Sequence, residues 1–106
     1  MRPIKHALLL TLALLAFIGP LGSAKAQTII TGRPIEVYAD PSDLVIALDT
    51  PGNCSNSSFF NVQRTNKNFA ELTAVVLTAF STGRSLRLFV ASCANDRNIV
   101  SHGSVF

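Results

Sequence analysis

Residues that build catalytic and metal sites are scarce in this sequence. It contains two histidines and two cysteines, and His102 is the only histidine after residue 26. A structural zinc site needs four such ligands, and the sequence after residue 26 contains three, Cys54, Cys93 and His102. No G-x-S-x-G motif or closely spaced pair of carboxylates stands out, and strand alternation would turn the adjacent Ser101 and His102 to opposite faces. We therefore expect no catalytic residues, no metal and no cofactor.

Positive charge is also missing once the N-terminus is set aside. Arg2, Lys5 and Lys25 account for the whole net charge of +3, because the other six basic residues are balanced by six acidic ones. Proteins that bind nucleic acid neutralise phosphates with clustered basic residues. A nucleic-acid partner is therefore not expected.

Long apolar runs occur only at the N-terminus. The run from residue 7 to 18 follows two basic residues and precedes Ala24-Lys25-Ala26, an A-x-A cleavage signal. It is too short to span a membrane. We interpret residues 1–26 as a signal peptide, with an uncleaved N-terminal anchor as the alternative, and residues 27–106 as a single domain. This interpretation predicts a secreted or periplasmic bacterial protein.

The two cysteines, Cys54 and Cys93, both lie in the expected mature domain. Small exported domains have marginal cores and are commonly stabilised by disulfides, which form in oxidising compartments. We predict a Cys54–Cys93 disulfide that closes a loop of about 40 residues, worth roughly 4 kcal/mol in the chain-entropy model.

A helix is predicted between Asn68 and Gly83. Asn68 is a good N-cap, and Glu71 is placed to complete a capping box. Gly83 supplies the left-handed residue that ends a helix. The side chains expected to face the core are Phe69, Leu72, Thr73, Val76, Ala79 and Phe80.

The first two expected strands differ in pattern. Residues 34–40 alternate, which predicts one face in and one face out. The members of one face are Ile35, Val37 and Ala39, and those of the other are Glu36 and Tyr38. Residues 44–48 are continuously apolar, which predicts a strand covered on both faces.

Three further strands complete the expected fold, at residues 58–63, 86–93 and 99–106, with a turn at 94–98. Residues 27–32 are expected to be a short lead-in. Five strands with one helix between the third and fourth is the chain order of an OB-fold, a small Greek-key barrel. We predict a mainly β, five-stranded OB-fold barrel. The same order allows an open sheet with one helix packed across it.

The segments FAEL at 69–72 and AFSTGRSLRLFV at 79–90 resemble the helix, turn and following strand of subtilase cytotoxin B subunits and related small exported bacterial proteins. The match covers about the central third of the mature chain. The resemblance implies a signal peptide, a disulfide and an OB-fold. For the toxin members it also implies ring pentamers that bind sialylated host glycans and deliver a separate catalytic A subunit.

The resemblance places the glycan site after the first strand, where Tyr38, Asp40 and Ser42 are the candidate residues. Ala39 stands where the family has a hydroxyl, and Ser42 is displaced from that position. The alternative interpretation is a solvated strand edge followed by a turn. An exported envelope or protein-interaction module without a glycan site is the alternative function.

The second face of the helix carries almost no charge, which is unusual for a helix exposed to solvent. Phe89 is expected on the outward face of its strand. Small and apolar exposed surfaces are typical of subunit contacts. We therefore predict a homo-oligomer, with a pentamer favoured, and Ala74, Leu77 and Phe89 as contact residues. Burial of this helix face within its own domain is the alternative.

Overall fold

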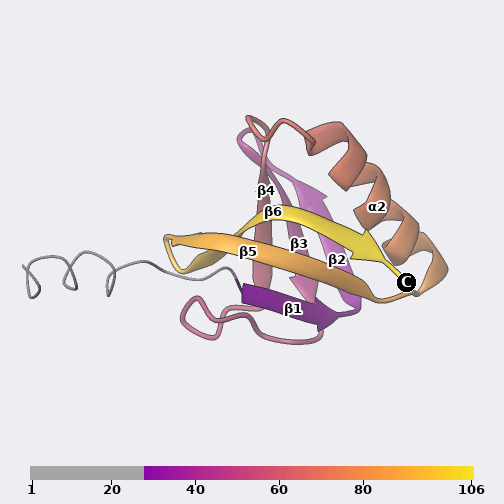
Figure 1. The fold of residues 1–106 in the computed structure, drawn as a ribbon, viewed down its shortest axis with the longest axis horizontal. Coiled ribbons are helices and arrows are strands. Elements are labelled where there is room, and N and C mark those ends of the chain that lie inside the picture. Colours follow the sequence, from indigo (N-terminus) through magenta and orange to yellow (C-terminus); the bar gives the residue numbers. More distant parts are fainter. Residues whose placement is uncertain (1–27) are drawn as a thin grey trace, which may run out of the picture.

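The computed structural model describes residues 28–106, and the predicted signal peptide lies outside that range (Figure 1). The described part is mainly β with one helix, as predicted. In chain order the elements are β1 (Thr28–Gly32), β2 (Pro34–Ala39), β3 (Asp43–Leu48), β4 (Phe59–Gln63), α2 (Phe69–Thr82), β5 (Leu86–Ala94) and β6 (Arg97–Val105).

The strands form one mixed sheet of six strands in the order β1-β5-β6-β4-β3-β2. Every neighbouring pair is antiparallel except β4 and β6, which run parallel over Phe60–Asn98 and Asn61–Ile99. The helix contacts β2, β4 and β6, and it lies along one side of the sheet (Figure 1).

The sheet has six separate strands where five were predicted, because the expected lead-in is itself a strand. Residues 28–32 form β1 and pair with β5. Only Arg33 separates β1 from β2, and its backbone turns away to bond Asp49. The Arg33 N–H donates to Asp49 Oδ1 at 2.8 Å, and the Arg33 carbonyl accepts from the Asp49 N–H at 3.0 Å. The two strands at the ends of the sheet order are therefore consecutive in the chain.

Strand β3 is buried on both faces, as its continuous apolar sequence predicts. Its residues from Leu44 to Leu48 are all buried, and Val45 and Ile46 are completely inaccessible. Leu44, Ile46 and Leu48 face the main hydrophobic core. That core also contains Phe60, Val62, Leu72, Val76, Leu86, Leu88 and Val100.

The prediction for the first residues of β2 is wrong at Ile35. Its side chain is 64% exposed, although alternation would place it beside the partly buried Val37. The pairing with β3 shifts register between Pro34 and Glu36, so Ile35 is the extra residue of a β-bulge. A bulge resets the alternation of side chains. Pro34 is buried and Ile35 turns outward.

The helix ends as predicted but does not begin with a capping box. Gly83 has φ 69°, and the Arg84 N–H bonds the Ala79 carbonyl at 3.0 Å, which is a left-handed C-cap. The Asn68 side chain makes no cap hydrogen bond. Its Nδ2 donates instead to the Ser101 carbonyl at 3.2 Å, so tertiary contact with β6 replaces the local cap.

The buried stripe of α2 is narrower than predicted. Leu72, Val76 and Ala79 are at most 2% exposed, whereas Phe80 is 45% exposed. Phe80 lies about 80° around the helix from Leu72, since each residue turns the helix by about 100°. Ala79 takes the place facing the sheet, which leaves Phe80 at the edge of the stripe.

Strands β5 and β6 form a long hairpin with a tight turn. Asn95 and Asp96 both have positive φ, 50° and 62°, as two-residue hairpin turns require. The turn is shorter than the predicted residues 94–98, because Ala94 already pairs with Arg97. This turn brings polar side chains to the end of the sheet near the β2–β3 turn.

Candidate functional site

A polar hollow of about 500 Å³ opens where the β2–β3 and β5–β6 turns approach each other. Two of the predicted glycan-site residues, Asp40 and Ser42, line it. The other lining residues are Asp43, Asn61, Gln63, Ala94, Asn95, Arg97 and Ile99. Four strands and two turns therefore contribute to one concave surface.

The register of the sheet explains why these side chains share a face. In β3 the core residues alternate with Asp43, Val45 and Ala47, which point to the other side. Between β3 and β4, Asp43 pairs with Gln63 and Val45 pairs with Asn61. Asn61 also pairs with Ile99 of β6 on its other side. The floor of the hollow is this second face of the sheet.

Asp40 forms one wall of the hollow and is held firmly by its own turn. Its Oδ1 accepts bonds from the Ser42 N–H at 2.9 Å, the Ser42 hydroxyl at 3.1 Å and the Asp43 N–H at 2.7 Å. The backbone N–H groups of Asp43 and Ser42 lower the pKa of the Asp40 carboxyl, because they stabilise its ionised form. Arg64 Nη2 donates to the Asp40 carbonyl at 2.9 Å.

A second wall carries the cation of the hollow, Arg97. Its guanidinium lies over the Phe59 ring, with 4.6 Å between Cζ and the ring centroid. Nη1 of Arg97 also donates to Asn61 Oδ1 at 3.5 Å, and Asn61 Nδ2 donates to Asp43 Oδ2 at 2.8 Å. Asn61 is 8% exposed, so a buried amide links the acidic and the basic wall.

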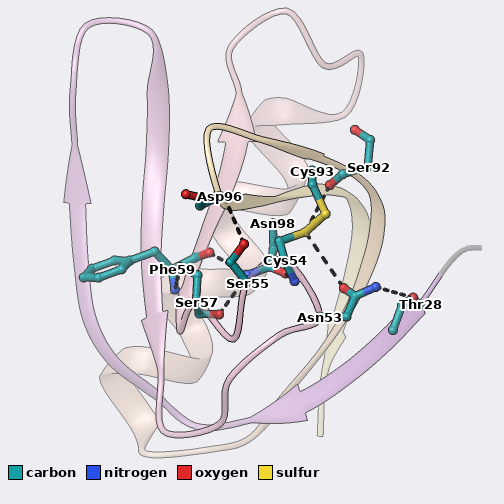
Figure 2. Close-up of a disulfide and its surroundings, with 10 residues drawn as sticks. All are labelled: Thr28, Asn53, Cys54, Ser55, Ser57, Phe59, Ser92, Cys93, Asp96 and Asn98. Carbon is teal, nitrogen blue, oxygen red and sulfur yellow. Dashed lines mark hydrogen bonds between the residues drawn. A yellow bond between two sulfur atoms is a disulfide. The ribbon is translucent and has the colours of Figure 1, made fainter.

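The disulfide predicted from the sequence is present between Cys54 and Cys93. It joins the β3–β4 connection to the end of β5, next to the buried Asn98 (Figure 2). Ser55 Oγ donates to Asp96 Oδ1 at 2.9 Å, which links the same connection to the β5–β6 turn. These contacts hold the turn that carries Asn95 and leads into Arg97, the first residue of β6.

The predicted glycan residues are thus partly brought together. Asp40 and Ser42 line the hollow, whereas Tyr38 does not. Tyr38 pairs with Val45 of β3, and Val45 pairs with Asn61 of β4 on its other side. The Tyr38 side chain is 38% exposed. Sequence reasoning missed Asp43, Asn61, Gln63, Asn95, Arg97 and Ile99 as site residues. The alternating polar residues of the 59–63 strand were the available signal.

The predicted oligomer residues lie away from the hollow. Leu77 is 45% exposed and Ala74 is exposed, so α2 does not bury its second face within its own domain. Phe89 is partly buried and stacks on the His102 ring, with 4.0 Å between centroids.

The prediction that alternation separates Ser101 from His102 is wrong. Ser101 Oγ and His102 Nδ1 are 2.9 Å apart. Phe89 pairs with His102 and Val90 with Val100, so Ser101 is the extra residue of a bulge, where alternation fails. Ser101 Oγ donates to the Phe89 carbonyl at 3.3 Å. In the contact between Ser101 and His102, the tautomer of the imidazole ring determines which atom donates the hydrogen bond.

Within residues 28–106, no group of three or more histidine, cysteine, aspartate or glutamate side chains could hold a metal ion. No helix in the same range has the length and apolar character needed to cross a membrane.

Comparison with known proteins gives no relative: no family model, no curated protein and no solved structure matches this chain.

Proposed function

We propose that this chain is an exported glycan-binding subunit that takes its ligand in the polar hollow and catalyses no reaction. The observation that carries the proposal is the convergence of two sets of polar residues on one concave surface: Asp40 and Ser42 from the β2–β3 turn, and Asn95 and Arg97 from the β5–β6 turn and the start of β6. Carboxylates accept hydrogen bonds from sugar hydroxyls, amides both donate and accept, and a guanidinium donates. Such a mixture suits a ligand rich in hydroxyl groups.

The fold we propose is an OB-type barrel in which β1 and β2 are halves of one bent strand. Support comes from the sheet order, whose two ends are β1 and β2, and from the parallel β4–β6 pair. Counted this way there are five strands, and the helix follows the third. OB-folds bind oligosaccharides on the face of their second and third strands, between two loops. The hollow lies on β3 and β4 between the corresponding turns.

We propose further that the subunit acts as a homo-oligomer, with a pentamer favoured, that recognises a host glycan and serves a separate catalytic A subunit. The exposed and almost uncharged face of α2, with Ala74 and Leu77, supports self-association. Several copies of a weak site on one assembly would raise the overall affinity for a surface that displays many glycans. The Cys54–Cys93 disulfide fits an oxidising compartment and hence export.

The alternative function is an exported envelope or protein-interaction module of the same fold. The observation that favours it is the apolar surface outside the hollow, where Leu77 and Phe80 are each 45% exposed. In that case α2 would contact a protein partner, and the hollow would bind no saccharide.

Binding to a glycan array separates the two functions. The oxidised protein is compared with Asn61→Ala, which removes the amide between the two walls, and with Thr78→Ala, a control on the exposed side of α2. We expect glycan binding by the protein and the control, and binding at least about tenfold weaker in Asn61→Ala, since polar contacts to charged groups are worth about 1.5–3 kcal/mol. No binding by a correctly folded, oxidised protein would reject the glycan site. Equal binding by all three proteins would move the site away from the hollow.

A further inference from the structure

The opposite charges of the hollow are held apart by one neutral side chain. Asn61 presents Nδ2 to the Asp43 carboxylate at 2.8 Å and Oδ1 to the Arg97 guanidinium at 3.5 Å. Because the amide occupies the space between them, the carboxylate and the guanidinium do not pair directly. Each charge therefore remains available at its own end of the hollow.

Arg97 is oriented for binding without being neutralised. Among residues 28–106 its side chain contacts the Phe59 ring and Asn61 Oδ1, and neither is a carboxylate. A guanidinium has five N–H donors, and one is used here. Stacking on an aromatic face leaves the edge of the guanidinium free for a planar acceptor. A carboxylate is the group that matches this edge with two parallel hydrogen bonds.

The opposite wall is acidic. Asp40 and Asp43 both line the hollow, and the hydrogen bonds to their side chains from residues 28–106 use one oxygen of each carboxylate. The second oxygens remain as acceptors. A protonated amine has three N–H donors and one positive charge, which suits this wall.

We infer that the ligand of this hollow is a saccharide that carries both a carboxylate and a protonated amine. The amine binds on the side of Asp40 and Asp43, and the carboxylate binds Arg97. A saccharide with only an acidic group would place a negative charge near the two aspartates. A saccharide with only an amine would place a positive charge near Arg97. The zwitterion matches both walls and brings no net charge into the hollow. This inference rests on the proposed glycan-binding function.

Four pyranoses provide a matched test: glucose, glucuronic acid, glucosamine and muramic acid. They carry, in that order, no charge, a carboxylate, an amine, and both groups. Each is titrated into the oxidised protein in mildly acidic buffer, and amide chemical shifts report the Kd. We expect muramic acid to bind at least about tenfold more tightly than glucose, because charge-assisted hydrogen bonds are the stronger kind.

Two charge-removing variants test which side chain recognises the amine and which recognises the carboxylate. Each variant has a matched control outside the hollow. Asp43→Asn should lose the preference for amine-bearing sugars and keep the preference for acidic ones, with Glu71→Gln as the control. Arg97→Gln should lose the preference for acidic sugars and keep the preference for amine-bearing ones, with Arg84→Gln as the control. Glu71 and Arg84 are exposed and do not line the hollow.

The outcomes separate the inference from the function on which it rests. If glucose binds as tightly as muramic acid, or if each variant weakens all four sugars equally, the zwitterionic ligand is wrong and the glycan site stands. If none of the four sugars binds, the inference and the proposed saccharide site both fail.

Discussion

The side chain of Asn98 is bonded to the backbone of Cys54 inside the protein. Oδ1 of Asn98 accepts a hydrogen bond from the Cys54 N–H at 3.2 Å, and Asn98 is fully buried. Its Nδ2 donates to the carbonyls of Ser57 and Phe59, both at 2.9 Å. One side chain on β6 therefore bonds three backbone groups of the β3–β4 connection and the start of β4, beside the disulfide (Figure 2).

Replacing Asn98 by alanine should destabilise the protein by about 3 kcal/mol. The change removes three hydrogen bonds to backbone groups, at about 1 kcal/mol for each, although the Ser57 carbonyl keeps its bond from the Gly52 N–H. Urea unfolding of the oxidised protein measures the loss. Asn53→Ala is the control, because Asn53 is exposed and its Nδ2 bonds the Thr28 hydroxyl at 3.0 Å. A similar loss in both variants would contradict the role assigned to Asn98.

Gly52→Ala should destabilise the protein through contact with the same asparagine. A Cβ at residue 52 would lie 2.3 Å from Asn98 Oδ1, closer than real contacts allow. Overpacking of this kind costs about 1–3 kcal/mol. In an Asn98→Ala background the obstructing atoms are gone, so Gly52→Ala should cost clearly less there. A double-mutant cycle from urea unfolding measures this coupling, and additive effects would show that the clash is relieved elsewhere.

Removing the disulfide should cost up to about 4 kcal/mol in the chain-entropy model for a loop of this size. The bond joins Cys54 and Cys93 across a sequence separation of 39 residues. We expect the Cys54→Ala/Cys93→Ala double variant to lower the Tm well below that of the oxidised protein. Calorimetry of the two proteins checks this, with reduced wild-type protein as a control that should behave like the variant. An unchanged Tm would mean that the reduced chain is already constrained.

The pH dependence of stability should contain a contribution from Asp40. Hydrogen bonds from the backbone of Asp43 and Ser42 lower its pKa below the ordinary value of 3.8. The ionised form is thus favoured by folding, so its contribution is present above the unfolded pKa and is lost as pH falls through the folded pKa. Asp40→Asn keeps an acceptor oxygen but does not titrate. Urea midpoints between neutral and strongly acidic pH should fall less steeply in this variant, and identical slopes would contradict the prediction.

Local sequence patterns predicted the elements whose environment is set by their own residues. The continuous apolar run of β3, the glycine stop at Gly83 and the disulfide between two cysteines each follow from one physical requirement, and each is present. The errors occur where tertiary contacts override the local pattern. Asn68 bonds β6 rather than its own helix, and bulges at Ile35 and Ser101 reverse the alternation.

The hollow itself was only half predictable. Asp40 and Ser42 are close in sequence and form a recognisable turn, so their position could be inferred. Asn61 and Arg97 are 36 residues apart, and their contact depends on the parallel pairing of β4 with β6. No local pattern encodes that pairing, because α2 and β5 separate the two strands along the chain.

The exposed face of α2 should hold copies of this chain together, and Leu77→Lys should separate them. Leu77 is 45% exposed within one copy, so a lysine there would change the stability of an isolated copy by less than about 0.5 kcal/mol. If residue 77 is buried in a contact between copies, the same lysine would be a buried unpaired charge and would strongly disfavour association. Thr65→Lys, at an exposed residue outside the helix, is the control.

Native mass spectrometry of oxidised residues 27–106 at micromolar concentration measures the assembly directly. We expect a pentamer for the wild-type protein and the Thr65→Lys control, and monomers for Leu77→Lys. A wild-type monomer would reject the ring and the multivalent binding that depends on it, and would favour the protein-interaction module. A wild-type dimer dissociated by Leu77→Lys would keep α2 as the interface and reject the toxin-like ring.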